Sequence, residues 1–159
     1  MDKLLKHHLK FVLKRYMDNK DTYVYADKDW LYVADRYSWV RIPSDTSPFS
    51  EKGYLTNENA RSTSTEKAMV FVPPYETSQM TELEDTGIRR VLDNDTKVKV
   101  LQSGDETVWL SKAILKPLVP KDVPVKYWQY RVGPCNAVYL TFWNDVDVRA
   151  LIAPVRKQD

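Results

Sequence analysis

Cysteine, histidine and glycine are scarce in this chain, and each shortage argues against a class of protein. Cys135 is the only cysteine, so an internal disulfide framework is impossible and a reducing, cytoplasmic setting is predicted. His7 and His8 are neighbours that would point about 100° apart on a helix, an arrangement unsuited to metal binding. The chain has four glycines and contains neither the P-loop motif nor the dinucleotide-binding motif, the two glycine-rich sequences that bind phosphate groups. We therefore predict no catalytic residues, no metal and no cofactor, and a protein that is not an enzyme.

Long apolar runs are also missing. None approaches the roughly 20 residues that a membrane-spanning helix needs, so no membrane partner is expected. Basic residues interrupt the opening stretch every three or four positions, which argues against a secretory signal. The 159 residues, 43% of them hydrophobic, are enough for one core, and we predict a single domain over residues 1–159.

The opening stretch, MDKLLKHHLKFVLKRY, has the pattern of an amphipathic helix. One side collects apolar residues that we expect to pack on the core, namely Leu5, Leu9, Val12, Leu13 and Tyr16. The nearly opposite side carries a basic row of Lys3, His7, Lys10 and Lys14, with Lys6 beside it. The whole chain has a net charge of +2, so this row is a local excess of positive charge. The row is either a solvated face or one that meets an acidic partner.

Short β-prone runs separated by polar turns make up most of the rest. We expect strands at 22–26, 30–34, 39–42, 67–75, 96–102, 107–110, 123–132, 137–143 and 148–155. Ser111 is placed to cap a second, short helix that Pro117 limits to about two turns. The stretch 44–95 is expected to be an irregular excursion, apart from the run at 67–75. Its polar part, 44–66, would be the most mobile, and 76–95 would be weakly helical at best. The predicted class is α+β, a mainly antiparallel sheet with two helices on one face.

Aromatic residues are abundant, with 5 Trp and 10 Tyr. The run KYWQYR (126–131) places Tyr127 and Trp128 on opposite faces of a predicted strand, so at least one ring faces away from the core. Exposed rings between Lys126 and Arg131 would stack on bases or anchor a protein partner. The same rings would equally well cover the edge of the core.

The order of these runs resembles a domain of the bacterial DNA sliding clamp, the β-subunit type of replicative polymerase. The resemblance rests on LLKHHLKFVLK followed by YVYADKDWLYVADRYSWVRI, and on WLSKAILKPLVPKDVPVKYWQY, AVYLTFW and VRALIAPVR. It covers about residues 3–43 and 96–156. It implies a clamp-like fold in which two helices face duplex phosphates without reading bases. A clamp chain holds three such domains, so a ring of this chain would be a homo-oligomer of about six copies. Such a ring would act as a processivity factor, and its small subunit would resemble the proteins of phages and mobile elements.

Two functions from different classes follow. The first is a non-enzymatic DNA-associated protein that contacts duplex phosphates through Lys3, Lys6, His7, Lys10, Lys14, Lys112 and Lys116. The second is a protein-interaction module, in replication or elsewhere, that docks through an exposed strand edge or an aromatic patch. Its predicted contact residues are Tyr127, Trp128, Tyr130, Pro154, Val155 and Arg156.

Overall fold

The computed structural model describes residues 3–17, 22–26, 29–34, 38–43, 60–62, 77–78, 80–132, 135–142 and 145–155. Within these ranges the elements are, in chain order, α1 (Lys3–Met17), β1 (Thr22–Ala26), β2 (Trp30–Ala34), β3 (Ser38–Pro43), β4 (Ala60–Ser62), β5 (Thr81–Val91), β6 (Lys97–Ser103), β7 (Glu106–Ser111), α4 (Lys112–Leu115), β8 (Val125–Val132), β9 (Cys135–Phe142) and β10 (Asp145–Ile152). The predicted helix at the start and the strands at 22–26, 30–34 and 39–42 are confirmed, as are those from 96 onward, with small shifts at their ends.

The strands join edge to edge in the order β4-β1-β2-β3-β10-β9-β8-β5-β6-β7. Three antiparallel meanders, β1–β3, β5–β7 and β8–β10, are each built from neighbours in sequence. Two long-range pairings, β3 with β10 and β5 with β8, connect the meanders. The short β4 adds to β1 in parallel. The sheet is therefore mainly antiparallel, and the predicted α+β class is confirmed.

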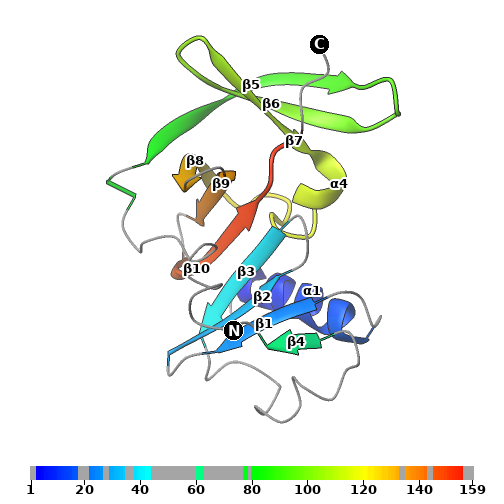
Figure 1. Cartoon of the computed structure of the whole chain (residues 1–159), viewed down its shortest axis with the longest axis vertical. Coiled ribbons are helices and arrows are strands. Elements are labelled where there is room, and N and C mark those ends of the chain that lie inside the picture. Colours follow the sequence, from blue (N-terminus) through cyan, green and yellow to red (C-terminus); the bar gives the residue numbers. More distant parts are fainter. Residues whose placement is uncertain are drawn as a thin grey trace.

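The sheet curls back on itself at one end. The backbone N–H of Val155 donates to the carbonyl of Trp109 at 2.8 Å, which links the residues after β10 to β7 at the far end of the strand order. Strands β10, β9, β8, β5, β6 and β7 thus form a closed circuit, and β3, β2, β1 and β4 extend away from it. In Figure 1 the β5–β7 ribbon lies at one end of the molecule and α1, β1, β2 and β4 lie at the other.

The two faces of the sheet bury different side chains. The larger core contains Leu4 and Phe11 of α1, Leu115 and Leu118 around α4, and inward-facing strand residues such as Leu140. Tyr32, Trp39, Tyr139 and Leu151 form a second cluster with partly buried Trp30, Trp128 and Tyr130 around it. Side chains alternate between the two clusters along β9 and β10. Val138, Leu140, Phe142, Ala150 and Ile152 join the larger core, whereas Tyr139 and Leu151 join the second.

The prediction that 44–95 is an irregular excursion is wrong for the last part of this stretch. Residues 81–91 form β5, an eleven-residue strand, where the sequence indicated weak helix at best. Its composition, TELEDTGIRRV, is polar and has little β-propensity. Pairing with β8 on one side and β6 on the other supplies backbone hydrogen bonds that outweigh local preference. Within 44–66 the structure describes only the three residues of β4, so the expected mobility of this segment stays a prediction. The predicted strand 67–75 lies outside the described residues.

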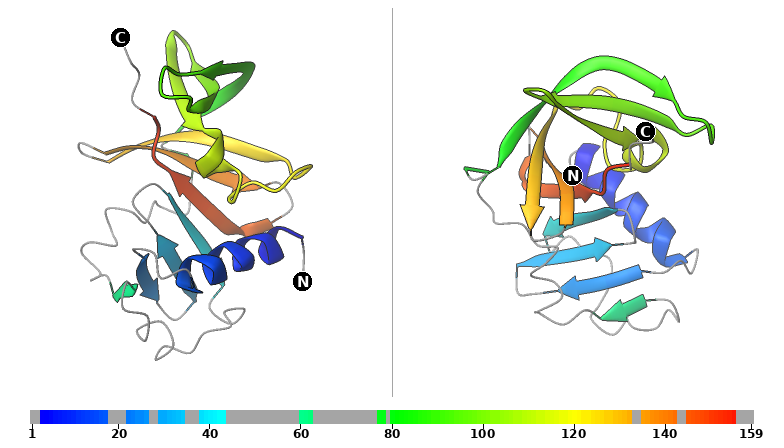
Figure 2. Two further views of the ribbon diagram at one scale, coloured as in Figure 1. Left: turned by 90° about the vertical axis from the view of Figure 1, so that its right-hand side faces the viewer. Right: turned by 45° about the horizontal axis from the view of Figure 1, so that its top comes forward.

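Helix α1 packs against β3 and β10, as the views in Figure 2 also show. It has neither Gly nor Pro between Lys3 and Met17, and Leu and Lys are strong helix formers. The buried side chains that the structure describes on it are Leu4, His8 and Phe11, which follow one another at helical spacing. The predicted core residues Leu5, Leu9, Val12, Leu13 and Tyr16 have side chains outside the described part. This buried stripe was not predicted from the sequence, because its middle position is a histidine and not an apolar residue.

Candidate nucleic-acid interface

Helix α1 is tied to the segment that follows α4 by three contacts from side chains to backbone carbonyls. Lys3 Nζ donates to the carbonyl of Lys121 at 2.8 Å. His7 Nε2 lies 3.2 Å from the carbonyl of Lys116, and His8 Nε2 lies 2.6 Å from that of Leu118. Carbonyl oxygens only accept, so each ring nitrogen in these contacts carries the hydrogen. The contacts place the basic row of α1 beside residues 116–121 although about a hundred residues separate them in sequence.

His8 is the buried member of this set. Its ring is fully inaccessible to solvent and meets the ring of Phe142 edge-on, with centroids 5.5 Å apart. Leu118, whose carbonyl accepts from His8, is itself fully buried in the larger core. A buried carbonyl that lost this donor would keep its desolvation cost without compensation. His8 therefore holds the helix and the segment after α4 in one fixed relation.

Helix α4 forms where the sequence predicted it, but it is short. Ser111 caps it by accepting from the backbone N–H of Ile114 at 3.4 Å, and it ends at Leu115, before Pro117. Leu118 and Val119 both donate to the carbonyl of Leu115, which tightens the last turn. Lys112 and Lys116 are exposed and lie one turn apart.

We call the resulting array the lysine surface. It consists of the exposed side chains that α1 and residues 112–121 contribute, namely Lys3, Lys6, Lys10, Lys14, Lys112, Lys116 and Lys121. All of the predicted DNA-contact residues belong to it or, like half-buried His7, lie between its members. Within 3–17 and 112–122 the sequence offers a single carboxylate, Asp122. Lys121 was not singled out from the sequence, because only the contact of its backbone carbonyl with Lys3 brings it beside α1.

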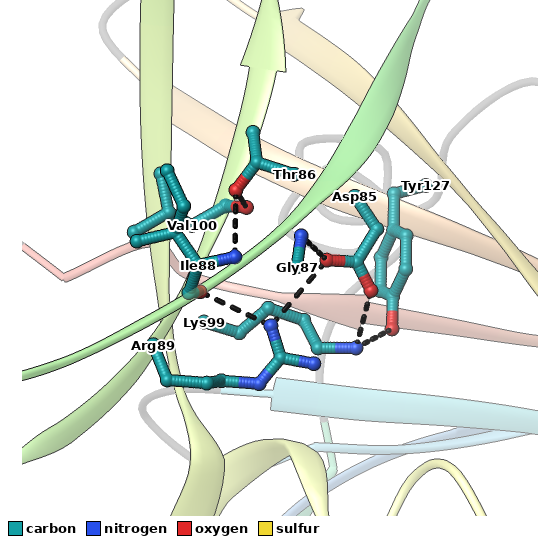
Figure 3. A network of polar contacts seen from close by, with 8 residues as sticks. All are labelled: Asp85, Thr86, Gly87, Ile88, Arg89, Lys99, Val100 and Tyr127. Carbon is teal, nitrogen blue, oxygen red and sulfur yellow. Dashed lines mark hydrogen bonds and ion pairs between the residues drawn. The ribbon is translucent and has the colours of Figure 1, made fainter.

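A separate polar network stabilises the bend of β5 (Figure 3). Between Asp85 and Arg89 the register with β6 shifts, so that Thr86, Gly87 and Ile88 face the single residue Val100. The side chain of Asp85 accepts from the backbone N–H of Gly87 at 3.0 Å, and Thr86 Oγ1 accepts from that of Ile88 at 3.1 Å. Gly87 has a φ of 76°, which glycine adopts without strain. The bulge thus satisfies its own amides with side chains.

The charges in this network are arranged around one carboxylate. Arg89 and Lys99 lie directly opposite each other on β5 and β6, an unfavourable pairing of like charges. Asp85 lies between them, with Oδ2 2.8 Å from Lys99 Nζ and Oδ1 3.5 Å from Arg89 Nη1. Burial acts to raise the pKa of Asp85, but the hydrogen bonds from Lys99 and Gly87 and the two cations together hold it below its usual value. Burial raises the pKa of Tyr127, whose hydroxyl is 3.4 Å from Lys99 Nζ.

Replacing Asp85 with asparagine is expected to cost about 0.5–1 kcal/mol at pH 7, since the side chain is a third exposed and its ion pairs are screened. The folded pKa lies below 3.8, so this stabilisation is present above about pH 4 and is lost as the pH falls through the folded pKa. Urea unfolding of both proteins at pH 7 and at pH 2.5 measures this. An equal difference at the two pH values would show that the charge of Asp85 contributes nothing.

The predicted aromatic contact residues do not form one patch. Tyr127 is 4% exposed in the larger core, whereas Trp128 and Tyr130 are half-buried against the second cluster on the opposite face. Trp128 Nε1 donates to Thr141 Oγ1 at 3.0 Å. Pro154 and Val155 are half-buried where Val155 meets β7, and Arg156 lies outside the described residues.

Sequence reasoning missed a pair of buried arginines on that second face. Arg41 of β3 and Arg149 of β10 lie directly opposite each other and are 5% and 7% exposed. The Arg41 guanidinium stacks 3.9 Å from the ring centroid of Trp30, and Arg149 donates to the hydroxyl of Tyr139. Burial raises the pKa of Tyr139, and the two guanidinium groups partly offset this effect. Only the β3–β10 register, which no local pattern encodes, brings these residues together.

No protein-family model matches the chain, and no solved structure matches it. In the described ranges, no group of three or more His, Cys, Asp and Glu side chains is arranged to hold a metal ion. Among those same residues, no helix combines the length and the apolar character that crossing a bilayer requires.

Proposed function

We propose that this protein binds duplex DNA without sequence preference through the lysine surface, and that it acts by binding rather than by catalysis. The observation that carries the proposal is that α1 lies against residues 116–121, and that α1 and residues 112–122 together carry seven exposed lysines and one carboxylate, Asp122. The helix stripe and the segment that follows the short second helix therefore lie next to each other. Their combined field attracts a polyanion more strongly than either alone.

The chemistry of the lysine side chains and their arrangement along α1 both favour contacts with phosphates over contacts with bases. Lys3, Lys10 and Lys14 follow one line along α1 about 16 Å long, at a rise of about 1.5 Å per residue. Flexible ammonium groups on such a line can follow the phosphates of a duplex, and contacts of this kind carry no sequence information. The rigid junction at His8 keeps Lys112, Lys116 and Lys121 at a constant position beside that line.

The sliding-clamp relationship stays a prediction from the sequence. DNA binding by the lysine surface does not require a ring, since the surface lies within one copy of the chain. A ring of about six copies would add topological retention on DNA to the electrostatic attraction. Solution mass measured over a range of protein concentrations, with and without a closed circular duplex, separates a ring from a monomer that binds DNA alone.

Fluorescence anisotropy with labelled duplexes of unrelated sequence tests the proposal. We expect affinities that agree within about threefold between sequences, since phosphates rather than bases are contacted. The logarithm of the binding constant should fall with log salt with a slope of roughly −4 to −5, corresponding to about five phosphate contacts. Absence of binding at low salt, or a strong preference for one sequence, would refute the proposal.

A further inference from the structure

Strand β5 has an open edge. It pairs with β8 over Thr81–Leu83 alone, whereas its pairing with β6 runs from Glu84 to Val91. Within the described residues, the side of β5 that faces away from β6 therefore has no strand beside it from Thr86 onward. Figure 1 shows this part of the ribbon extending well past β8. In this register Val125, the first residue of β8, lies opposite Asp85, so β5 from the bulge at Thr86–Ile88 onward extends past the end of β8 and leaves the edge open.

The backbone groups on this edge can be assigned from the turn that follows. Leu92 donates to the carbonyl of Thr96 at 2.9 Å, so this pair is a hydrogen-bonded one. Hydrogen-bonded and non-hydrogen-bonded pairs alternate in an antiparallel ladder. Arg90 therefore bonds to β6, while the N–H and C=O groups of Arg89 and Val91 point outward. These four groups are the template for an added strand.

The side chains at this edge are unusual for a solvated surface. Ile88 and Val91 are 49% and 65% exposed, and they are the exposed large hydrophobic residues of the described structure. Arg89 and Arg90 lie between them and are also exposed. Charge alone would be the ordinary protection of an open edge against unwanted pairing. Two exposed β-branched residues on either side of the charges work against such protection.

From this geometry we infer that residues 86–91 of β5 are a docking site for an extended segment of a partner protein in which two adjacent acidic side chains are flanked by apolar ones. The segment adds as a strand beside β5 and bonds to the backbone of Arg89 and Val91. Arg89 and Val91 project from one face of β5, so an acidic side chain of the partner meets Arg89 while an apolar one covers Val91. The Arg89–Asp85 ion pair is exposed and 3.5 Å long, so exchanging it for a new carboxylate costs little.

A second copy of this chain fits the edge poorly. Two-fold antiparallel pairing of β5 with itself would bring Arg89 and Arg90 of one copy against the same residues of the other. Like charges opposite each other in a ladder are destabilising. The acidic segment of a different protein meets no such repulsion. The inference is independent of DNA binding, which uses residues on α1 and 112–121.

The test uses two acetylated, amidated hexapeptides, GVEEVG and GVKKVG, titrated into the isotopically labelled full chain. We expect GVEEVG to shift the amide signals of residues 86–91 and to slow hydrogen exchange at Arg89 and Val91. GVKKVG should bind at least about tenfold more weakly. In a variant with R89E and R90E this preference should reverse. Signals that move at the lysine surface instead, or no binding of either peptide up to millimolar concentration, would overturn the inference.

Val91→Pro supplies the backbone control. The outward N–H of Val91 takes no part in the β6 ladder, so proline is tolerated there on folding grounds while it removes a donor and obstructs an added strand. It should weaken GVEEVG binding by about tenfold or more, whereas Val91→Thr, which keeps the N–H and the β-branch, should retain most of it. Equal binding by the two variants would exclude strand addition. Concentration-dependent dimers that Val91→Pro dissolves would assign the edge to a second copy and refute the acidic partner.

Discussion

Replacing Lys10 and Lys14 with glutamate is expected to weaken duplex DNA binding by roughly ten- to a hundredfold at moderate salt and to flatten the salt slope by about two units. Both side chains are exposed, and both lie on the basic row of α1. Two phosphate contacts are lost, so two fewer counterions are released. The new carboxylates also repel the duplex. The loss should be the same for unrelated sequences, because no base contact is removed.

A matched control separates the position of the charges from their number. Lys97 of β6 and Lys126 of β8 are exposed lysines outside the lysine surface, and Lys126 makes only a 3.9 Å contact with Glu82. Changing both to glutamate alters the net charge of the chain by the same amount. We expect this control to reduce binding by less than about threefold. Similar losses in the two double variants would show that net charge, and not the lysine surface, governs binding.

His8→Ala is expected to lower the free energy of unfolding by about 2–4 kcal/mol. The substitution empties a fully buried site beside Phe142 and leaves the buried carbonyl of Leu118 without its 2.6 Å donor. Urea denaturation followed by tryptophan fluorescence measures the change. Among the described core residues of α1, His8 combines packing and hydrogen bonding, so its loss should exceed that of an exposed neighbour such as Lys6 many times over.

His8→Gln distinguishes the hydrogen bond from the volume of the ring. A glutamine amide can reach toward the carbonyl of Leu118 and donate to it, although it fills less of the space beside Phe142. We expect it to recover roughly 1 kcal/mol of the loss. A loss below about 0.5 kcal/mol in His8→Ala would mean that α1 is not held on residues 116–121 through this residue. The lysine surface would then have no fixed geometry.

The two proposed binding surfaces would together suit a protein that brings a nucleic acid and a protein together. The lysine surface depends on α1 and residues 112–121, and the open edge depends on the part of β5 that extends past β8. Their tests use different probes and different variants, so each can fail while the other stands. Positive charge is common to both, yet the edge adds exposed Ile88 and Val91, which duplex phosphates would not use.

The sequence by itself determined the elements whose signals are local. Alternation in β9 and β10 separates residues such as Leu140 and Tyr139 onto opposite faces, because successive strand residues point in opposite directions. Ser111 and Pro117 bound α4 through one hydrogen bond and one missing N–H. The basic row of α1 follows from helical spacing alone. Each of these depends on residues within a few positions of one another.

Tertiary structure alone decided the features that join distant segments. β5 is a strand because β8 and β6 form backbone hydrogen bonds with it, although its polar sequence has little β-propensity. His8 is buried because the carbonyl of Leu118 lies opposite it, and Arg41 faces Arg149 because β3 pairs with β10 in one register. Lys121 joins the lysine surface through Lys3, more than a hundred residues away. Local periodicity specifies which face of an element is apolar, but the partner of that face is chosen by the packing of the whole chain.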